Sequence, residues 1–320
     1  MSVTKGVAIP LFLCHTNIMK NTHLQHPEDS ILAGDLSVLD WFEETDYVDL
    51  SVKIDGCPAI VWGTNPANGE FFVGTKSVFN KVKIKINHSH AEIDANHTGE
   101  VALILHACLA NLPRTNRIIQ GDFIGFGGDD TYTPNTITYV FDEIIEQTII
   151  VAPHTLYTAE NDLRDAIARP LDSALSDTDT CKFVMPRCWQ IDEDFDEVIA
   201  FARQMSTTCE FLTDKQSRQV QQQLNSVIRA GLDIDDITLE ALAFANQIDV
   251  NVLRLWKLVA SIKMQMLSLC RNNGPKAYIG NRQCGGEGYV RTNNYGMFKL
   301  VDRMKFSHAN FNNGKFACAG

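Results

Sequence analysis

The sequence has few basic residues for its length. With 28 lysine and arginine residues against 39 aspartate and glutamate residues, the chain of 320 residues has a formal net charge of -11. This balance excludes a protein that coats nucleic acid by bulk positive charge, because the footprint of such a protein is basic. Any contact with nucleic acid must therefore come from a local basic patch.

Paired cysteines and long apolar runs are also absent. The nine cysteines form no Cys-x-x-Cys pair, so we expect reduced thiols rather than a zinc site or a disulfide framework. The apolar run from Val7 to Cys14 has only Lys5 ahead of it and no cleavage signal behind it. It is far shorter than the roughly 20 residues of a membrane span. These absences predict a soluble, cytoplasmic protein with no membrane partner.

Short β-branched or aromatic runs separated by turn residues extend from about residue 48 to 151. Such runs are typical of strands, because these side chains suit a pleated surface. The expected strands cover 48–54, 59–62, 70–73, 117–125 and 136–143. A helix is expected over 92–112, where apolar residues recur at helical spacing until Pro113.

The composition changes after about residue 156. Up to residue 271 there are few glycines and apolar residues recur at helical spacing, which predicts four or five helices. Strand-like runs return at 277–279 and 289–291. We therefore expect an α+β fold in three parts. These are an N-terminal segment (1–47), a main domain (48–155 and 272–320) and an all-α helical insertion (156–271).

The run Lys53-Ile54-Asp55-Gly56 ends a strand-like segment, and three further short motifs follow it in order. These are Gln120–Phe123, Glu287–Val290 and Phe298–Asp302. Together they resemble the covalent nucleotidyltransferase superfamily of ATP-dependent ligases and capping enzymes, most closely its phage-type RNA ligases. The resemblance covers roughly residues 48–142 and 277–305. It implies a nucleotidyltransferase (ATP-grasp-like ligase) domain of antiparallel sheets with helices, and only some 15 residues after Lys305 leave no room for a C-terminal OB-fold.

The resemblance implies that Lys53 is the nucleophile that forms a lysyl-AMP adduct. Burial and neighbouring cations are expected to lower the pKa of its amine. Asp55 would hold the ribose side of the nucleotide, and Gly56 would let the backbone approach the nucleotide closely. Lys76 would touch the ribose or the incoming 5′-phosphate.

Two acidic residues and one aromatic residue complete the implied site. Glu287, between two glycines, would hold a divalent metal, Mg²⁺ or Mn²⁺. Asp122 would contact ribose or metal, although the family usually has a longer glutamate there. Phe141 is expected to stack on the purine, with an ordinary core phenylalanine as the alternative.

The last motif departs from the family. Lys299 would contact the α-phosphate and help to lower the pKa of Lys53, but the second lysine of this motif is replaced by Val301. We expect Arg303, two residues further on the same strand face, or Lys305 to supply the missing cation.

A lysine-rich stretch offers a local basic patch. Lys81, Lys83 and Lys85 follow Lys76 with no acidic residue among them. Binding of a phosphate backbone and a merely solvated face are both consistent with this pattern. A second polar cluster contains His88, His90, Asp94 and His97; its spacing matches no zinc motif, so a polar loop ahead of a helix is the preferred interpretation.

The sequence therefore predicts an ATP-dependent RNA ligase that joins 5′-phosphate and 3′-hydroxyl ends with magnesium or manganese. If a bacteriophage encodes it, it would act in nucleic acid repair in the host cytoplasm. A DNA nick-sealing ligase shares the first chemical step and remains open. A non-catalytic or protein-directed module with the same fold is the third alternative, because of Val301.

Overall fold

The computed structural model describes residues 24–306 and has a mixed α+β fold with largely antiparallel sheets. The apolar run 7–14 and residues 307–320 lie outside the described residues. Between residues 24 and 306, no helix is long and apolar enough to cross a membrane. Six cysteines are free thiols, namely Cys108, Cys181, Cys188, Cys209, Cys270 and Cys284. The expectation of reduced thiols is wrong for Cys57, which is disulfide-bonded.

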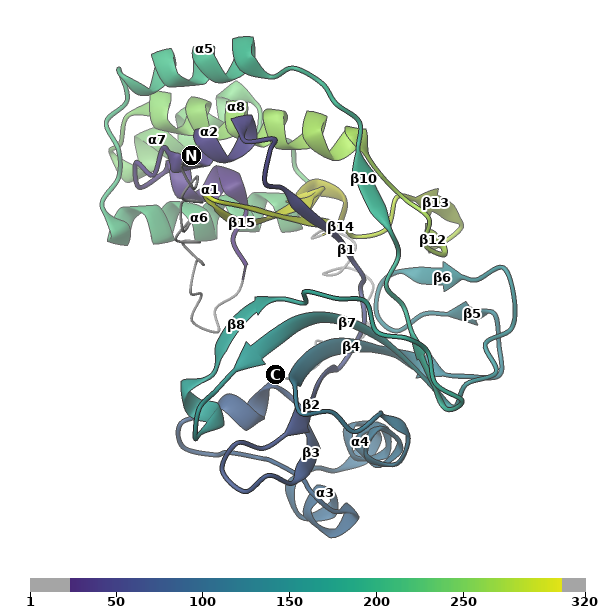
Figure 1. The fold of residues 1–320 in the computed structure, drawn as a ribbon. Coiled ribbons are helices and arrows are strands. Elements are labelled where there is room, and N and C mark those ends of the chain that lie inside the picture. The colour runs from purple at the N-terminus through teal and green to yellow at the C-terminus, as the bar shows by residue number, and fades with distance from the viewer. Residues whose placement is uncertain (1–23, 307–320) are drawn as a thin grey trace, which may run out of the picture.

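A three-stranded antiparallel sheet lies at the centre of the molecule (Figure 1). Its order is β1 (Asp49–Lys53), β14 (Gly288–Asn293) and β15 (Gly296–Val301). Because side chains alternate along a strand, one face carries Leu50 and Val52 and packs on helices, whereas Ser51 and Lys53 lie on the opposite face. The predicted alternation of the segment from 48 to 54 is confirmed.

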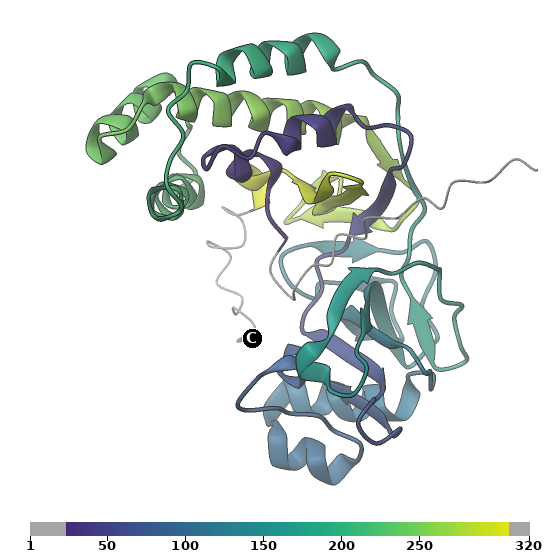
Figure 2. The same cartoon turned by 60° about the vertical axis from the view of Figure 1, so that its left-hand side comes forward.

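A larger sheet has six strands. It forms a second lobe, which lies below the helices in both views (Figures 1 and 2). Its main path is β3 (Phe71–Gly74), β2 (Ala59–Thr64), β4 (Ile118–Phe126), β7 (Ile149–Thr158) and β8 (Ile167–Pro170), with β9 (Cys181–Phe183) parallel to β7. α4 (Gly99–Asn111) packs its buried side chains on this sheet through an apolar core.

Two smaller sheets join the lobes. One has the order β13 (Arg282–Cys284), β12 (Lys276–Ile279), β6 (Thr138–Val140) and β5 (Thr131–Tyr132). The other pairs β10 (Cys188–Gln190) with β11 (Cys270–Asn272). Strands distant in sequence thus meet next to the end of β1.

The helical layer covers the apolar face of the three-stranded sheet (Figure 2). It contains α5 (Asp196–Ser206), α6 (Asp214–Arg229), α7 (Asp236–Asn246) and α8 (Val250–Leu269). The N-terminal helices α1 (Pro27–Ile31) and α2 (Ser37–Glu43) pack into the same layer. Four helices in the insertion agree with the prediction of four or five.

The predicted start of the helical insertion, residue 156, is wrong. β7 continues to Thr158, and β8, β9 and β10 follow, so the helices begin only at Asp196. Glycine is scarce after residue 156, but it is equally scarce in strand interiors, so this composition does not distinguish helices from strands. Composition therefore placed four strand segments in the wrong class.

The predicted helix over 92–112 is two helices. α3 (His90–Asn96) begins with a capping box between Ser89 and Glu92. α4 begins after Thr98, where Gly99 adopts a φ of +63°. The backbone is extended at His97 and Thr98, which separates the end of α3 from the start of α4. The positive φ at the next residue is one that glycine adopts readily.

Candidate active site

Lys53 and Glu287 meet because β1 and β14 are antiparallel neighbours. Lys53 is paired with Gly288, so the preceding residue, Glu287, lies beside the lysine. Lys53 Nζ donates a hydrogen bond of 2.6 Å to Glu287 Oε2. The two side chains are 26% and 15% exposed, so this ion pair is largely shielded from solvent.

The surroundings of Lys53 raise the pKa of its amine, contrary to the prediction that they lower it. Burial by itself favours the neutral amine, but Glu287, Asp122 and Asp55 all favour the ammonium and outweigh burial. An opposite charge nearby stabilises the charged form. Lys53 is therefore an ammonium held by carboxylates in this structure.

Lys299 lies on the same face of the sheet as Lys53. It is paired with Val290, which is itself paired with Ser51 on β1. Burial lowers the pKa of Lys299, and the nearby Lys53 lowers it further. The register of the three strands thus brings Lys53, Glu287 and Lys299 to one face of the sheet, and their roles in a reaction stay a prediction.

The cation expected at Arg303 is not available to this site. β15 ends at Val301, so the strand alternation that would direct Arg303 toward Lys53 does not continue. Arg303 is buried and bonded to Glu28 and Asp29, on the side of the helical layer. Lys305 is exposed beyond this turn. Lys76 is exposed, and the charges of both Arg303 and Lys76 help to lower the pKa of Lys299.

Asp55 is fixed by the protein itself. Its carboxylate accepts hydrogen bonds from Asn135 Nδ2 at 2.8 Å and from the backbone N–H groups of Thr136 and Ile137 at 2.9 and 3.1 Å. Its own N–H donates to the hydroxyl of Tyr139 at 2.6 Å. Asp55 therefore anchors the turn after Lys53 to β6 and the segment before it, and its contact with ribose stays a prediction.

Gly56 leaves room for protein rather than for nucleotide. A Cβ atom at this position would lie 2.7 Å from Cβ of Asp122 and 2.9 Å from Phe123 O. Gly56 therefore allows the turn to pack against β4, which carries Asp122. Gly288 has a comparable function, since its φ is +141° and a Cβ there would lie 2.2 Å from Leu300 O.

Asp122 lies on β4 between Ala59 of β2 and Ala152 of β7. Its Oδ1 is 3.7 Å from His154 Nε2, and His154 Nδ1 lies 2.7 Å from the hydroxyl of Thr155. Asp122 is close enough to Lys53 to raise the pKa of the lysine. The structure thus places Asp122 in the site and adds His154.

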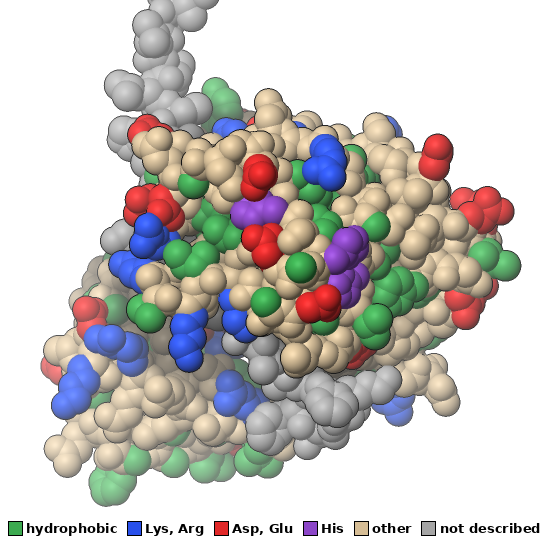
Figure 3. All heavy atoms as spheres, turned by 90° about the horizontal axis from the view of Figure 1, so that it is seen from below, with side chains coloured by type: hydrophobic (Ala, Val, Ile, Leu, Met, Phe, Trp, Pro, Cys, Tyr) green, Lys and Arg blue, Asp and Glu red, His purple; other side chains and the backbone are tan. Residues whose placement is uncertain are grey.

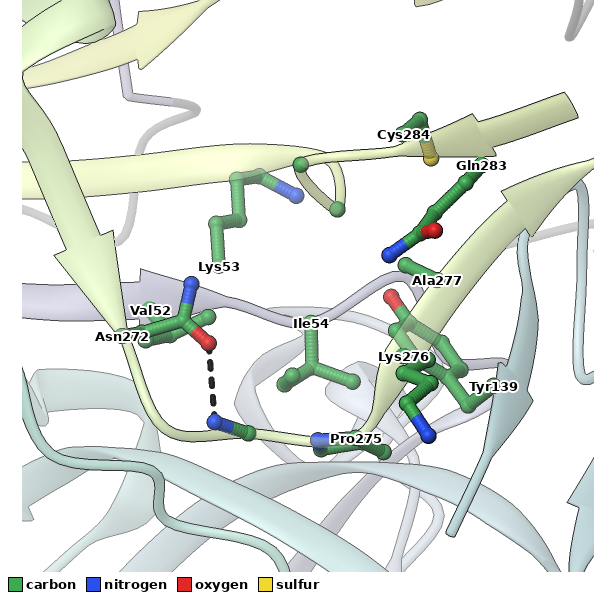
Figure 4. A pocket seen from close by; sticks show the side chains of 13 residues that line it. Val52, Lys53, Ile54, Tyr139, Asn272, Pro275, Lys276, Ala277, Gln283 and Cys284 are labelled. Atoms are coloured by element: carbon green, nitrogen blue, oxygen red, sulfur yellow. Dashed lines mark hydrogen bonds between the residues drawn. The ribbon is translucent and has the colours of Figure 1, made fainter.

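A cavity of about 200 Å³ opens beside Lys53 (Figure 4). Its wall includes Ile54, Tyr139 and the glycine pair that precedes Glu287. The Gln283 amide extends toward the cavity from β13 (Figure 4). The amide of Asn272, on another wall, is held by Tyr289 and by the N–H of Gly274.

Phe141 does not line this cavity, contrary to its predicted stacking role. Its ring packs edge-on against Tyr132, with the ring centroids 5.8 Å apart, at the border of an apolar cluster. Tyr139, two residues earlier, lines the cavity instead. The alternative of an ordinary core phenylalanine therefore describes Phe141.

The three lysines of the basic patch differ in their contacts. Lys81 and Lys83 are exposed on the loop after β3, whereas Lys85 donates its ammonium to Asn96 O at 2.7 Å. Figure 3 shows lysine and arginine side chains grouped on one side of this lower face. Lys81 and Lys83 remain candidates for phosphate contacts, while Lys85 is tied to the end of α3.

The histidines of the second polar cluster form hydrogen bonds within the lobe of the six-stranded sheet. His106 Nε2 lies 2.9 Å from Asp94, and His106 Nδ1 lies 2.7 Å from His90 Nδ1. His88 Nε2 lies 3.2 Å from the Asn65 amide. No group of three or more histidine, cysteine or acidic residues in 24–306 could hold a metal ion by itself.

Comparison with known proteins decides the family. A family model matches residues 21–251 and 237–315, which include every residue of the candidate site. The chain belongs to DUF6267, a family of unknown function. No curated protein and no solved structure matches the chain.

Three site residues of this DUF6267 member were missed in the sequence. His154, Asn272 and Gln283 belong to no motif. The pairing of strands brings His154 near Asp122, and Asn272 and Gln283 line the cavity beside Lys53. The one available signal was the position of Gln283, four residues before Glu287 on the adjoining hairpin.

Proposed function

We propose that this protein is an ATP-dependent RNA ligase that acts through a lysyl-AMP intermediate. The observation that carries the proposal is the convergence of Lys53, Glu287 and Lys299. Lys53 and Glu287 are separated by 234 residues in sequence, yet their side chains are 2.6 Å apart. Lys299 lies on the same sheet face.

The reaction begins with attack of Lys53 Nζ on the α-phosphorus of ATP. The new N–P bond replaces the bond to the leaving pyrophosphate, and the amine loses its proton. An oxygen of an RNA 5′-phosphate then attacks the same phosphorus and releases Lys53. Finally the 3′-hydroxyl of a second end attacks the 5′-phosphorus, and AMP leaves.

Lys53 must be deprotonated before it attacks, and Glu287 is placed to control that proton. The Glu287 carboxylate stabilises the ammonium form of Lys53. The ammonium would lose this stabilisation when another cation, such as a metal ion, pairs with Glu287. Lys299 and Lys76 are positioned to neutralise phosphate charge as the triphosphate enters. The buried Val301 supplies no such charge.

In this proposal, Glu287 and Asp122 would hold the magnesium or manganese ion together with the phosphates of ATP. Both lie close enough to Lys53 to affect the pKa of its amine. Mg²⁺ commonly binds one or two carboxylates together with waters and substrate phosphates. When bound, the ion would screen the charge of the triphosphate.

Incubation with ATP labelled on the α-phosphate, with magnesium or manganese, tests the proposal directly. We expect a covalent label that is absent in Lys53→Ala and in Lys53→Arg. Lys215→Ala, an exposed residue of α6, is the matched control and should label normally. Absence of label in the native protein, or label that survives in Lys53→Ala, refutes the proposal.

A second assay identifies which nucleic acid receives the AMP from Lys53. A panel of nicked RNA, DNA and hybrid duplexes, with single-stranded RNA, separates an RNA ligase from the DNA nick-sealing alternative.

A non-catalytic module is favoured by two observations, the raised pKa of Lys53 and the buried Val301. Binding of ATP without any adduct would establish that alternative.

A further inference from the structure

The two-stranded ribbon of β10 and β11 presents an exposed tryptophan. Trp189, in the middle of β10, is 52% exposed. Within residues 24–306, no aromatic ring stacks on it and no cation lies over it. The other tryptophans of the chain are 0%, 0% and 3% exposed, in the order Trp41, Trp62 and Trp256. Trp189 therefore offers to solvent a ring that has no stacking partner in the described part of the fold.

The direction of Trp189 follows from its neighbour in β10. The thiol of Cys188 donates to Leu50 O at 3.0 Å and packs against the apolar core of the helical layer. Because successive side chains of a strand point to opposite faces, the indole of Trp189 lies on the other, outer face of the ribbon. A single exposed apolar residue is common on protein surfaces. The charges around Trp189 therefore decide what it can bind.

Two arginines share the outer face of the ribbon. Arg271 is directly opposite Trp189 in the register of β10 and β11, so the two side chains point to the same face. Arg187 is exposed and directly precedes β10, and its carbonyl accepts from the N–H of Asn273, so the ribbon continues by one pair. Arg271 donates to two backbone carbonyls at the end of α8 and not to a carboxylate. The arginine ion pairs within residues 24–306 involve neither residue.

The positive charge continues from the ribbon to the cavity beside Lys53. Residues 271–286 include three basic residues and no acidic one, although the chain as a whole has a net charge of -11. Beyond the ribbon, these are Lys276 on β12 and Arg282 on β13, and Lys276 lines the cavity. Lys276 lies 3.5 Å from Asp142, but both side chains are exposed, so this pair contributes little. The ribbon and the β12–β13 hairpin thus form a basic surface next to the candidate site.

The opposite end of β10 is acidic. Residues 192–194 are an aspartate, a glutamate and an aspartate, all exposed, and they lead up to α5 (Figure 1). Like charges repel, so a polyanion on the ribbon is disfavoured at this end. It is favoured from Trp189 toward Arg187 and Lys276. The distribution of charge therefore directs a polyanion toward the cavity and away from the helical layer.

We propose that the outer face of the β10–β11 ribbon binds a single strand of RNA beside the cavity that contains Lys53. The proposal rests on the proposed ligase function, and it names a surface that holds the nucleic acid. The ring of Trp189 stacks on a base, which binds any sequence because every base has an aromatic face. Arg187 and Arg271 contact phosphates, for which the planar guanidinium is well suited.

Tryptophan fluorescence tests the contact, because Trp189 is far more exposed than the other three tryptophans. The full chain is titrated without ATP with a single-stranded oligoadenylate of about 12 nucleotides, which is within the usual site size. We expect saturable quenching of the emission and protection of Trp189 from acrylamide. Absence of saturable binding, or binding that leaves acrylamide quenching unchanged, overturns the proposal.

Variants locate the contact with a fluorescein-labelled form of the same oligoadenylate, followed by anisotropy. Trp189→Ala should weaken binding about tenfold, the usual effect of losing one stacked base. Trp189→Phe keeps an aromatic ring and should bind more tightly than Trp189→Ala. Phe244→Ala removes another exposed ring, on α7, and should bind like the native protein. Native affinity in Trp189→Ala refutes the assignment.

The salt dependence of binding tests the phosphate contacts. Arg187→Ala should reduce the slope of log affinity against log salt by roughly 0.7, the value for one phosphate of a single strand. Arg218→Ala, on the exposed side of α6, is the matched control and should keep the native slope. An unchanged slope in Arg187→Ala contradicts the proposed path of the strand.

These binding assays are independent of the formation of the AMP adduct, which the native protein shows or fails to show by itself. RNA binding through Trp189 without any adduct would support this surface and refute the ligase proposal. An adduct together with RNA binding that does not depend on Trp189 would refute the surface and leave the ligase proposal intact.

Discussion

Val301 and Lys53 are paired with the same residue, Gly288, from its two sides. The position where the motif of the RNA ligases that the sequence resembles would have a second lysine is therefore in the same row of the sheet as Lys53. Val301 is buried in an apolar cluster with Ile54 and Tyr139. The charge around Lys53 is consequently dominated by carboxylates, and this imbalance has measurable effects.

Glu287→Gln should lower the pKa of Lys53, because Glu287 is the strongest of the groups that raise it. Competitive acetylation followed by mass spectrometry measures the reactivity of each lysine between pH 8 and 11.5. The midpoint for Lys53 should move to lower pH in the variant, while Lys215 keeps its midpoint. An unchanged Lys53 midpoint would show that the ion pair does not exist in solution.

Gly56→Ala should destabilise the protein by about 1 to 3 kcal/mol, the usual cost of inserting a methyl group into packed structure. The added Cβ would lie 2.7 Å from Asp122 and force β4 away. Gly285→Ala is the matched control, because nothing lies within 4 Å of its added Cβ. Urea denaturation compares the two variants, and equal stability would contradict the contact.

The double variant Lys81→Ala/Lys83→Ala should weaken binding of single-stranded RNA without loss of the AMP adduct. Each lost phosphate contact should reduce the slope of log affinity against log salt by roughly 0.7. Fluorescence titration at several salt concentrations gives this slope. Lys182→Ala/Lys215→Ala removes the same charge from other surfaces and should retain the native slope. If both double variants lose affinity equally, bulk charge and not a local patch is responsible.

His26 makes stability depend on pH. Burial, with help from Arg303 and Lys263, lowers its pKa from 6.5 to about 2, against the opposing effect of Glu28. The unfolded chain therefore takes up the proton first, so this contribution is complete above about pH 6.5 and falls by up to about 1.4 kcal/mol per pH unit below it. Urea denaturation at pH 7.5 and 5.5 should show a loss that is about 1 kcal/mol smaller in His26→Gln. Identical losses would mean that His26 is protonated in the folded protein.

The sequence contained enough information for the strands around Lys53. Alternation from Val48 to Ile54 predicts that Lys53 lies opposite the apolar face. This local pattern is reliable because one face of the sheet is apolar and the other is polar. The same reasoning failed for Arg303, because alternation holds only while the strand continues. No residue near Val301 marked the end of β15.

The choice between Phe141 and Tyr139 shows a different limit. Both are aromatic and lie in one short segment, but which of them lines the cavity depends on the pairing of β6 with β12, more than 130 residues away. The hydrogen bonds of Asp55 were equally unpredictable, because its three donors come from residues 135 to 137. Such contacts are set by topology and leave no local pattern.

Gly285 and Gly286 join β13, which borders the cavity beside Lys53, to β14 in the other sheet. Nothing lies within 4 Å of an added Cβ at either position, and Gly286 adopts a φ of +83°. A change of angle between the two sheets can therefore be absorbed at this junction. Lys53 and Glu287 would move together with the three-stranded sheet, so the ion pair would keep its length while the cavity wall at Gln283 changes its distance from Lys53.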